Sequence, residues 1–389
     1  MSITSAGRPL RVAHIIRDGG GTAPVELTVA AKLRDRGHRV TLYGPPEVRA
    51  HAHDAGFGLN PLDWPPGLPE SLIPRMTGAS AAWARRLAPR LGAGTDLVVA
   101  DCTAFGALMA ARLAGVPSAA VMPTVYLLGA RTYTSAGLGD QAAVVAGVNR
   151  ARGALGLPPV ASLAEQILDA DRLLVLTARA FEPPDVRPPD HARYVGPQPP
   201  RTPQDPPGFR PPEGDGPLVL VSLSTSDQGQ LGLLERLLAA LGGLPVRALV
   251  TLGPSVPAGR LRPPANAVLE RYVPHAAVLP YADLVVTHAG HGTVLTAVSA
   301  GVPLVCVPIG RDQPAVAARV ERHGLGVRAD PDAGVADLRT AIRHALDEPA
   351  YRAAARRMAR AIEPPDRVVD EIEALAATPT GDADDRPIS

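Results

Sequence analysis

Residues 288–293, which read HAGHGT, combine residue types that could bind a phosphate group. The glycines Gly290 and Gly292 allow the backbone to approach an anion closely, and His288 and Thr293 can each donate a hydrogen bond. The apolar run before this segment predicts a buried strand, and the residues after it predict a helix. Backbone N–H groups at the start of a helix are unpaired and carry partial positive charge. The segment therefore predicts an anion-binding turn.

Two polar residues, Asp312 and Gln313, follow the next predicted strand, at residues 304–307. The sequence GVP at residues 301–303 is expected to end the intervening helix, because proline cannot continue it. A carboxylate beside an amide can accept and donate hydrogen bonds to hydroxyl groups. The pair therefore predicts a site that holds a sugar.

Residues 281–313 resemble the C-terminal donor-binding motif of the family-one, nucleotide-sugar-dependent glycosyltransferases, especially bacterial members that decorate natural products. The histidine, both glycines, the threonine, the GVP sequence and the DQ pair stand at that family's spacing. The resemblance covers most of the chain and is strongest from residue 218 to about residue 326. It implies an α/β chain with the GT-B fold, in which two Rossmann-like domains have parallel sheets facing a central cleft. It also implies sugar transfer with inversion at the anomeric carbon, without a metal or other cofactor.

The resemblance assigns further residues to the sugar nucleotide. Thr225, in the loop after the predicted strand Leu218–Ser222, matches a Ser or Thr that binds the pyrophosphate. Tyr272 matches an aromatic residue that stacks on the nucleobase, and the backbone of Val273 would bond to the base edge. His275 stands where many relatives carry glutamine. The predicted donor-binding residues are Thr225, Tyr272, Val273, His275, His288, Gly290, His291, Gly292, Thr293, Asp312 and Gln313.

One departure from the family concerns the nucleotide. Many relatives place a glutamate three residues after the phosphate-loop threonine, where it binds both ribose hydroxyls. This chain has Thr296 at that position. A missing bidentate acceptor suits a deoxyribose better than a ribose with a 2′-hydroxyl, so we expect a dTDP-sugar rather than a UDP-sugar.

A second departure concerns the general base, which must take the proton of the attacking acceptor hydroxyl. Relatives usually carry a histidine three residues before the proline at the first helix start, and here Gly21 takes that position before Pro24. Asp101, at the tip of the predicted strand at residues 97–100, matches the aspartate that orients this histidine. Asp101 could accept the proton itself or only cap the next helix. Asp18 is the second candidate, with a solvated loop residue as its alternative role, whereas His14 is expected to be packed inside a strand.

The missing histidine leaves several functions open. The acceptor could be an acidic phenol or enol, or a carbon nucleophile, so that no strong base is needed. Alternatively, the chain could be a catalytically silent accessory protein, or a nucleotide-sugar 2-epimerase with the same fold. The intact donor motif favours an active transferase, because a silent partner has no need to hold a sugar nucleotide.

The acceptor is expected to be a small secondary metabolite, bound by variable segments of the first domain. Residues 60–78, with Trp64, and residues 124–140, with Tyr126 and Tyr133, are the candidate walls. Loop segments commonly carry such variation. Their sequences do not identify the acceptor.

Alternating predicted strands and helices indicate an open parallel sheet in each half of the chain. We expect an acceptor-binding domain at residues 1–200, a proline-rich linker at 201–217 and a nucleotide-sugar-binding domain at 218–364. The strand ending the first domain is expected near Tyr194, and a strand of the second at residues 269–273. In the resembling family the last helix, here residues 365–378, crosses back to the first domain. A flexible tail is expected at residues 379–389.

The composition of the 389 residues limits the possible partners. The net charge is +1, which argues against binding to nucleic acid. The two cysteines, Cys102 and Cys306, lie in different halves and do not suggest a disulfide framework. No apolar segment is long enough to cross a membrane, and the sequence starts without a charged-then-apolar leader. We therefore expect a cytoplasmic protein, monomeric or homodimeric, that binds a sugar nucleotide and a small aglycone.

Overall fold

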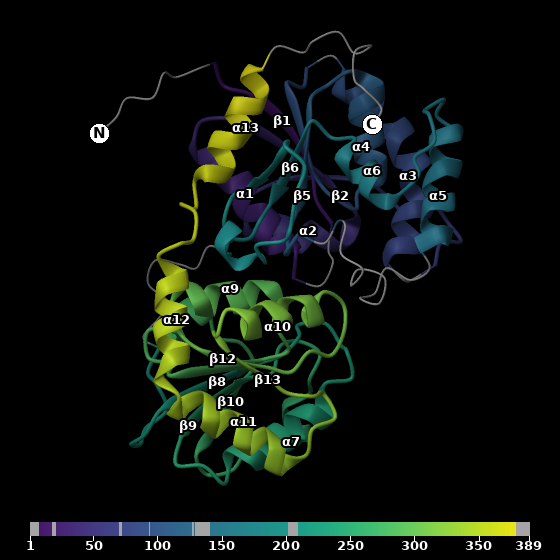
Figure 1. Ribbon diagram of the computed structural model, residues 1–389. Helices are drawn as coiled ribbons and strands as arrows, with labels where there is room; N and C mark the ends of the chain where they lie inside the picture. The colour runs from purple at the N-terminus through teal and green to yellow at the C-terminus, as the bar shows by residue number, and fades with distance from the viewer. Residues whose placement is uncertain are drawn as a thin grey trace.

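The structure, a computed structural model, describes residues 8–17, 21–69, 72–92, 94–126, 128, 141–200 and 209–378. These residues form two lobes, each with a parallel sheet at its centre and helices on both faces of the sheet (Figure 1). Strands and helices alternate along the chain in both lobes. The predicted α/β architecture of two parallel-sheet domains is confirmed.

The sheet of the first lobe has seven parallel strands in the order β3-β2-β1-β4-β5-β6-β7. Every residue of the central strands β4 and β5 is buried, as their apolar runs at residues 97–100 and 119–122 indicate. The last strand, β7, ends at Tyr194, within the proline-dense part of the sequence. The strands are β1 (Arg11–Ile15), β2 (Arg39–Gly44), β3 (Leu59–Pro61), β4 (Leu97–Asp101), β5 (Ser118–Met122), β6 (Arg172–Val175) and β7 (Ala192–Tyr194).

Helices cover both faces of this sheet. The longest, α3, packs closely on α4, where a methyl group on Gly106 would lie 2.4 Å from the carbonyl oxygen of Ser80. Residues 72–78 form the start of α3, so part of the segment expected to be a variable wall is helical instead. The helices are α1 (Ala23–Asp35), α2 (Arg49–Asp54), α3 (Leu72–Leu91), α4 (Phe105–Ala114), α5 (Gln141–Gly153) and α6 (Leu163–Leu168).

The sheet of the second lobe has six parallel strands in the order β10-β9-β8-β11-β12-β13. Its strands are β8 (Leu218–Ser222), β9 (Arg247–Thr251), β10 (Ala267–Glu270), β11 (Leu284–Thr287), β12 (Leu304–Cys306) and β13 (Gly326–Arg328). Its helices are α7 (Leu231–Leu241), α8 (His275–Val278), α9 (His291–Ser299), α10 (Gln313–Arg322), α11 (Val335–Asp347) and α12 (Pro349–Ala359). The strand predicted at residues 269–273 was placed too late, because β10 ends where its neighbour β9 ends and residues 271–273 belong to the following loop.

The last helix, α13 (Arg367–Ala377), returns to the first lobe (Figure 1). Its apolar face is buried among residues of the first sheet and of α1. On its outer side, Arg36, which directly follows α1, forms ion pairs with Asp370 and Glu373. The buried residues of α13 are Val368, Val369, Ile372 and Leu375.

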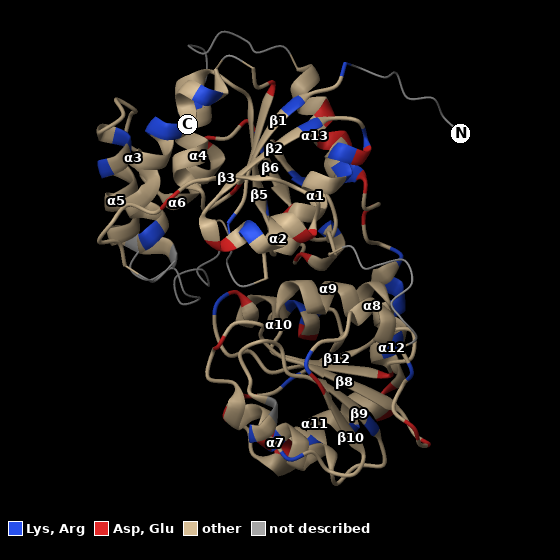
Figure 2. Ribbon diagram, turned by 180° about the vertical axis from the view of Figure 1, so that it is seen from behind, with Lys and Arg blue, Asp and Glu red and all other residues tan. Residues whose placement is uncertain are grey.

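Both sheets have a switch point at their centre, where the strand order changes direction. The switch lies between β1 and β4 in the first lobe and between β8 and β11 in the second. Ligands of such folds bind in the crevice at the carboxyl ends of these strands. Helices α9 and α10 lie on the side of the second lobe that faces the first (Figures 1 and 2).

Acidic and basic residues are interspersed along the elements of both lobes (Figure 2). No helix among the described residues is long and apolar enough to span a membrane.

Candidate functional site

The predicted phosphate turn joins β11 to α9 at the second switch point. Gly290 is the N-cap of α9, and a methyl group there would lie 2.7 Å from both Cε1 and Nε2 of His288. Because its φ is −59°, Gly290 is required for space rather than for an unusual backbone conformation. Gly292 is exposed, and no atom lies within 4 Å of the position that its side chain would take. The turn therefore packs the His288 ring against Gly290 and leaves open space beside Gly292.

Three buried histidines, defined here as His14, His288 and His291, have lowered pKa values. Burial lowers the pKa of His288 to about 4, and the nearby charge of Arg311 acts in the same direction. Burial and the charge of Arg319 lower the pKa of His291 to about 3. His288 is therefore neutral at pH 7, with one ring N–H to donate. His291 is turned inward, and its Nε2 has no hydrogen-bond partner among the described residues.

Thr225 and Gly21 face each other between the two lobes. Thr225 is exposed in the loop after β8, and its Oγ1 is 3.9 Å from the position that a side chain on Gly21 would take. Gly21 has φ +103°, a conformation that residues with a side chain rarely adopt. The hydroxyl predicted to bind pyrophosphate thus lies opposite the position of the missing histidine, and the backbone at that position suits only glycine.

The segment predicted to bind the nucleobase lies at the same edge of the second sheet. The Tyr272 side chain is 75% exposed, so its ring is free to stack on a planar ligand. Nε2 of His275 lies 3.0 Å from Oγ of Ser222, and burial lowers the pKa of His275. Val273 is partly buried against the core of the second lobe.

Asp312 and Gln313 stand at the start of α10, but their side chains have different surroundings. Oε1 of Gln313 accepts hydrogen bonds from the backbone N–H groups of Ile309 and Gly310, and its Nε2 donates to Gln228. Gln313 is buried and holds the loop in shape. Asp312 is partly buried, and its Oδ2 accepts a hydrogen bond from Thr124 of the first lobe. Burial raises the pKa of Asp312, although this hydrogen bond opposes the shift.

Asp101 stands at the first switch point, at the end of β4, and is fully buried. Its Oδ1 accepts hydrogen bonds from Nε of Arg17, at 2.8 Å, and from the backbone N–H and hydroxyl of Thr103. The N-cap of α4 is Ala104, so Asp101 does not cap that helix. Its Oδ2 is buried and has no hydrogen-bond partner among the described residues, so an acceptor would reach this oxygen only if the surrounding side chains moved. The role of Asp101 as the base stays a prediction.

Arg17 lies at the first switch point, where its guanidinium pairs with Asp101. The pKa of Arg17 is raised, because Asp101 and Glu26 outweigh the lowering effect of burial. His14 is fully buried in β1, and burial lowers its pKa to about 3 against the opposing charge of Asp101. The switch point is therefore built around a buried Arg17–Asp101 ion pair.

Known proteins resemble this chain over much of its length. Residues 235–375 match the family model described as Erythromycin biosynthesis protein CIII-like, C-terminal domain. The chain is 32% identical over 313 residues to 4'-demethylrebeccamycin synthase of Lentzea aerocolonigenes. The alignment covers 72% of this chain and 73% of that protein. The chain belongs to the family-one bacterial natural-product glycosyltransferases.

Solved structures show the GT-B fold of this glycosyltransferase. The glycotransferase of kitacinnamycin superposes with a TM-score of 0.79, and the calicheamicin glycosyltransferase CalG4 superposes with a TM-score of 0.77. Each is 25% identical, and the alignments cover 95% and 96% of this chain and 100% of those chains. The predicted family, fold and enzyme class are therefore confirmed.

Two of the residues predicted to contact the acceptor, Trp64 and Tyr126, pack against other residues of the first lobe. The Trp64 ring lies 4.8 Å from that of Trp83, with the Arg75 guanidinium over its face, and its Nε1 donates to Glu47. The Tyr126 side chain is buried in the core of the lobe. The remaining predicted residues, Asp18 and Tyr133, lie outside the described part of the chain.

Two residues that contact the candidate site residues, Arg17 and Gln228, were not predicted from the sequence. Arg17 was detectable as a charged residue two positions after a buried strand, at the end of the sheet where a Rossmann-like lobe places its ligand. Gln228 gave no such signal, because it lies in a polar loop and meets Gln313 only through folding.

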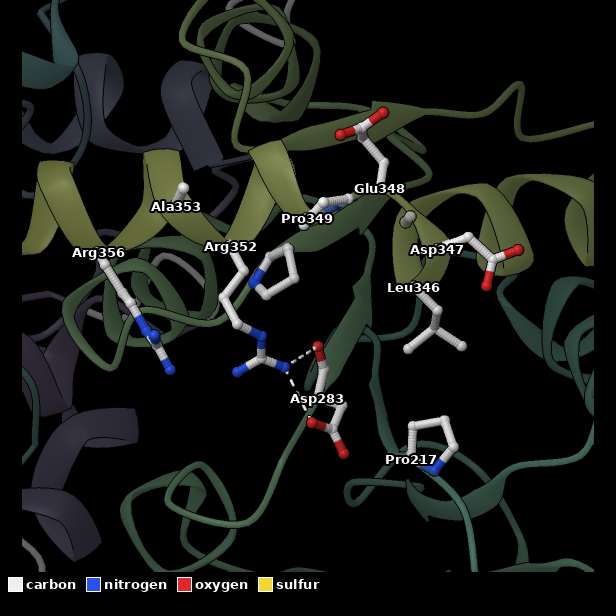
Figure 3. Close-up of a pocket in the computed structure, with 11 residues that line it drawn as sticks. Pro217, Asp283, Leu346, Asp347, Glu348, Pro349, Arg352, Ala353 and Arg356 are labelled. Carbon is white, nitrogen blue, oxygen red and sulfur yellow. Dashed lines mark hydrogen bonds and ion pairs between the residues drawn. The ribbon is translucent and has the colours of Figure 1, made fainter.

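A cavity of about 450 Å³ lies at the opposite edge of the second sheet (Figure 3). Its lining includes Pro217, Asp283 and Pro303, which directly precede β8, β11 and β12. Figure 3 shows the Arg352 side chain reaching Asp283, with a 3.0 Å ion pair. This cavity is separate from the phosphate turn, which lies at the carboxyl ends of the same strands. Among the described residues, no group of three or more His, Cys, Asp or Glu could hold a metal ion.

Proposed function

We propose that this glycosyltransferase transfers a sugar from dTDP to a small secondary-metabolite acceptor, with inversion at the anomeric carbon. The observation that carries the proposal is the phosphate turn, in which Gly290 makes room for the His288 ring and Gly292 opens the helix start. The family model and relatives named for antibiotic biosynthesis support a small-molecule acceptor.

The donor would be held by its charge and by its base. The N-terminus of α9, the neutral His288 ring and the Thr225 hydroxyl supply hydrogen bonds to the diphosphate and stabilise the charge that builds as it leaves. Tyr272 would stack on the base, and Asp312 would accept hydrogen bonds from the sugar. These groups need no metal, so transfer is expected to persist in excess EDTA.

The preference for dTDP rests on Thr296. Its hydroxyl donates to the carbonyl oxygen of Gly292 within α9, at 2.7 Å, so it offers a ribose no charged bidentate acceptor. A Thr296→Glu variant is expected to gain affinity for UDP relative to dTDP. An unchanged ratio of the two dissociation constants would remove Thr296 from the choice of nucleotide.

The acceptor would be one that ionises without a strong base. Gly21 offers no side chain at the usual base position, and the Asp101 carboxylate is buried and bonded to Arg17. A phenol, an enol, a comparably acidic N–H group or a carbon nucleophile meets this condition.

A binding measurement and a product screen test the function. At a dTDP concentration 100-fold above its Kd, the free energy of unfolding should rise by about 2.7 kcal/mol. Sugar nucleotides incubated with a panel of phenolic and aliphatic aglycones should give mass-spectrometric products from the phenolic set. Stability unmoved by any nucleotide would instead indicate a silent accessory protein.

A further inference from the structure

Helix α10 carries the predicted sugar-binding residues at its start and lies against the first lobe (Figure 1). Near its end, Arg319 forms a buried ion pair with Glu182, which follows β6 of the first lobe. Their side chains are 9% and 0% exposed. Nε and Nη2 of Arg319 both donate to Oε2 of Glu182, at 2.9 and 2.6 Å.

The same pair holds the chain just after β5. The backbone N–H of Tyr126 donates to Oε1 of Glu182, at 2.6 Å, and the carbonyl oxygen of Tyr126 accepts from Nη2 of Arg319, at 3.2 Å. Both carboxylate oxygens of Glu182 and both backbone polar groups of Tyr126 are therefore hydrogen-bonded. A buried pair with all its groups satisfied fixes geometry, because either charge left alone would be costly.

The other end of α10 contacts the same segment. The Thr124 hydroxyl donates to Oδ2 of Asp312, and Nε2 of His323, just past the helix, lies 3.1 Å from the carbonyl oxygen of Phe181. Val125 and Phe181 pack in the core of the second lobe. Helix α10 is thus attached to the first lobe at both ends, through the loops that follow β5 and β6.

We infer that Arg319 and Glu182 are positioning residues for sugar transfer: they set the separation between the donor-sugar loop and the acceptor-side segment 124–126. The inference rests on the proposed function, in which Asp312 holds the sugar. Arg319 lies on the same rigid helix as Asp312, so its distance from Glu182 determines how far Asp312 lies from the first lobe. The hydrogen bonds of Glu182 and Arg319 go to each other, to Tyr126 and to Ala315, and the charge of Arg319 reaches the turn only as an influence on the buried His291. Glu182 is therefore the residue to change, because its replacement leaves the Arg319 charge in place and should leave nucleotide binding intact.

The first test is kinetic and uses Glu182→Gln in the full chain. An amide of the same shape must present an N–H either to Arg319 or to the Tyr126 N–H, so one of these bonds is lost. We expect kcat/KM for transfer to fall at least tenfold and the ratio of transfer to donor hydrolysis to fall with it. The Kd for dTDP should change less than twofold. A general loss of folding would weaken dTDP binding as well.

The second test measures the separation of the lobes directly and does not depend on catalysis. Spin labels on Ala82→Cys and Ala239→Cys, exposed positions on α3 and α7, report the distance between the lobes. Cys102 and Cys306 are buried with raised thiol pKa values, so the labels should react with the introduced cysteines. Glu182→Gln should broaden the distance distribution.

Asp169→Asn is the matched control. Asp169 pairs with Arg112 and the buried Arg152 entirely within the first lobe, and the same carboxylate-to-amide change should leave the distance distribution unaltered. If Glu182→Gln does not fold, Arg319→Lys keeps the charge and loses the paired donation, with the same expected outcome. An unbroadened distribution in the folded variant overturns the inference. Failure of the wild-type protein to bind dTDP would refute the proposed function and leave this distance test decisive.

Discussion

Replacing Gly290 with alanine tests whether the phosphate turn works through the His288 ring. The alanine methyl group would lie 2.7 Å from two atoms of that ring, closer than real contacts allow, so the ring must turn away. The φ of −59° suits alanine, and the loss of stability at an N-cap should stay below about 1 kcal/mol. A lost hydrogen bond to a charged phosphate is worth about 1.5–3 kcal/mol, so dTDP affinity should fall roughly 10- to 100-fold.

Calorimetric titration of dTDP into four proteins measures this effect. The proteins are the wild type, Gly290→Ala, His288→Ala and the double variant, whose two changes should be strongly non-additive because both act through one ring. Full dTDP affinity in Gly290→Ala would refute the reasoning. So would an equal loss in the His288→Ala background, because the methyl group would then act on the ligand directly.

Three further predictions follow from the buried charges and from the missing base. Asp101→Asn removes the carboxylate that pairs with the Arg17 guanidinium, and should lower the free energy of unfolding in urea by about 3–5 kcal/mol. Unchanged stability would show that this ion pair does not stabilise the fold. Below pH 6.5 His14, His288 and His291 bind protons in the unfolded chain but stay neutral in the folded chain. Stability should therefore fall as the pH is lowered from about 6.5 to about 4, because the folded chain holds these histidines neutral; urea unfolding midpoints that do not change with pH would contradict this. Gly21→His should destabilise the protein by about 1–2 kcal/mol without raising transfer, as measured by thermal unfolding and product formation; faster transfer would show that the backbone there accepts a base.

Local patterns were sufficient to predict most of the fold. Buried parallel strands have largely apolar sequences, so β8 was predicted with its observed boundaries. The strand-turn-helix at residues 284–299 was also predictable, because its apolar run, its glycines and its helix start are adjacent in the sequence. That the turn binds phosphate stays a prediction. The edge strand β10 was misplaced, since an edge strand ends where its partner ends rather than where its own sequence changes.

The parts of the site that the sequence did not reveal depend on long-range contacts. Arg17 meets Asp101 across 84 positions, and Arg319 meets Glu182 across 137. Gln313 was predicted to hold the sugar, yet folding turns its amide oxygen towards the backbone of its own loop. The residue type at such a position fixes what a side chain can donate or accept, but only the fold determines which partner it meets.

The return of α13 to the first lobe means that the polypeptide passes between the lobes twice, once before β8 and once after α12. Two covalent connections limit how freely one lobe can rotate against the other. A chimaera of two such enzymes that exchanged nucleotide-binding lobes would need to keep the final helix of its acceptor-lobe parent. Cutting the chain at the first crossing alone would leave the two halves joined.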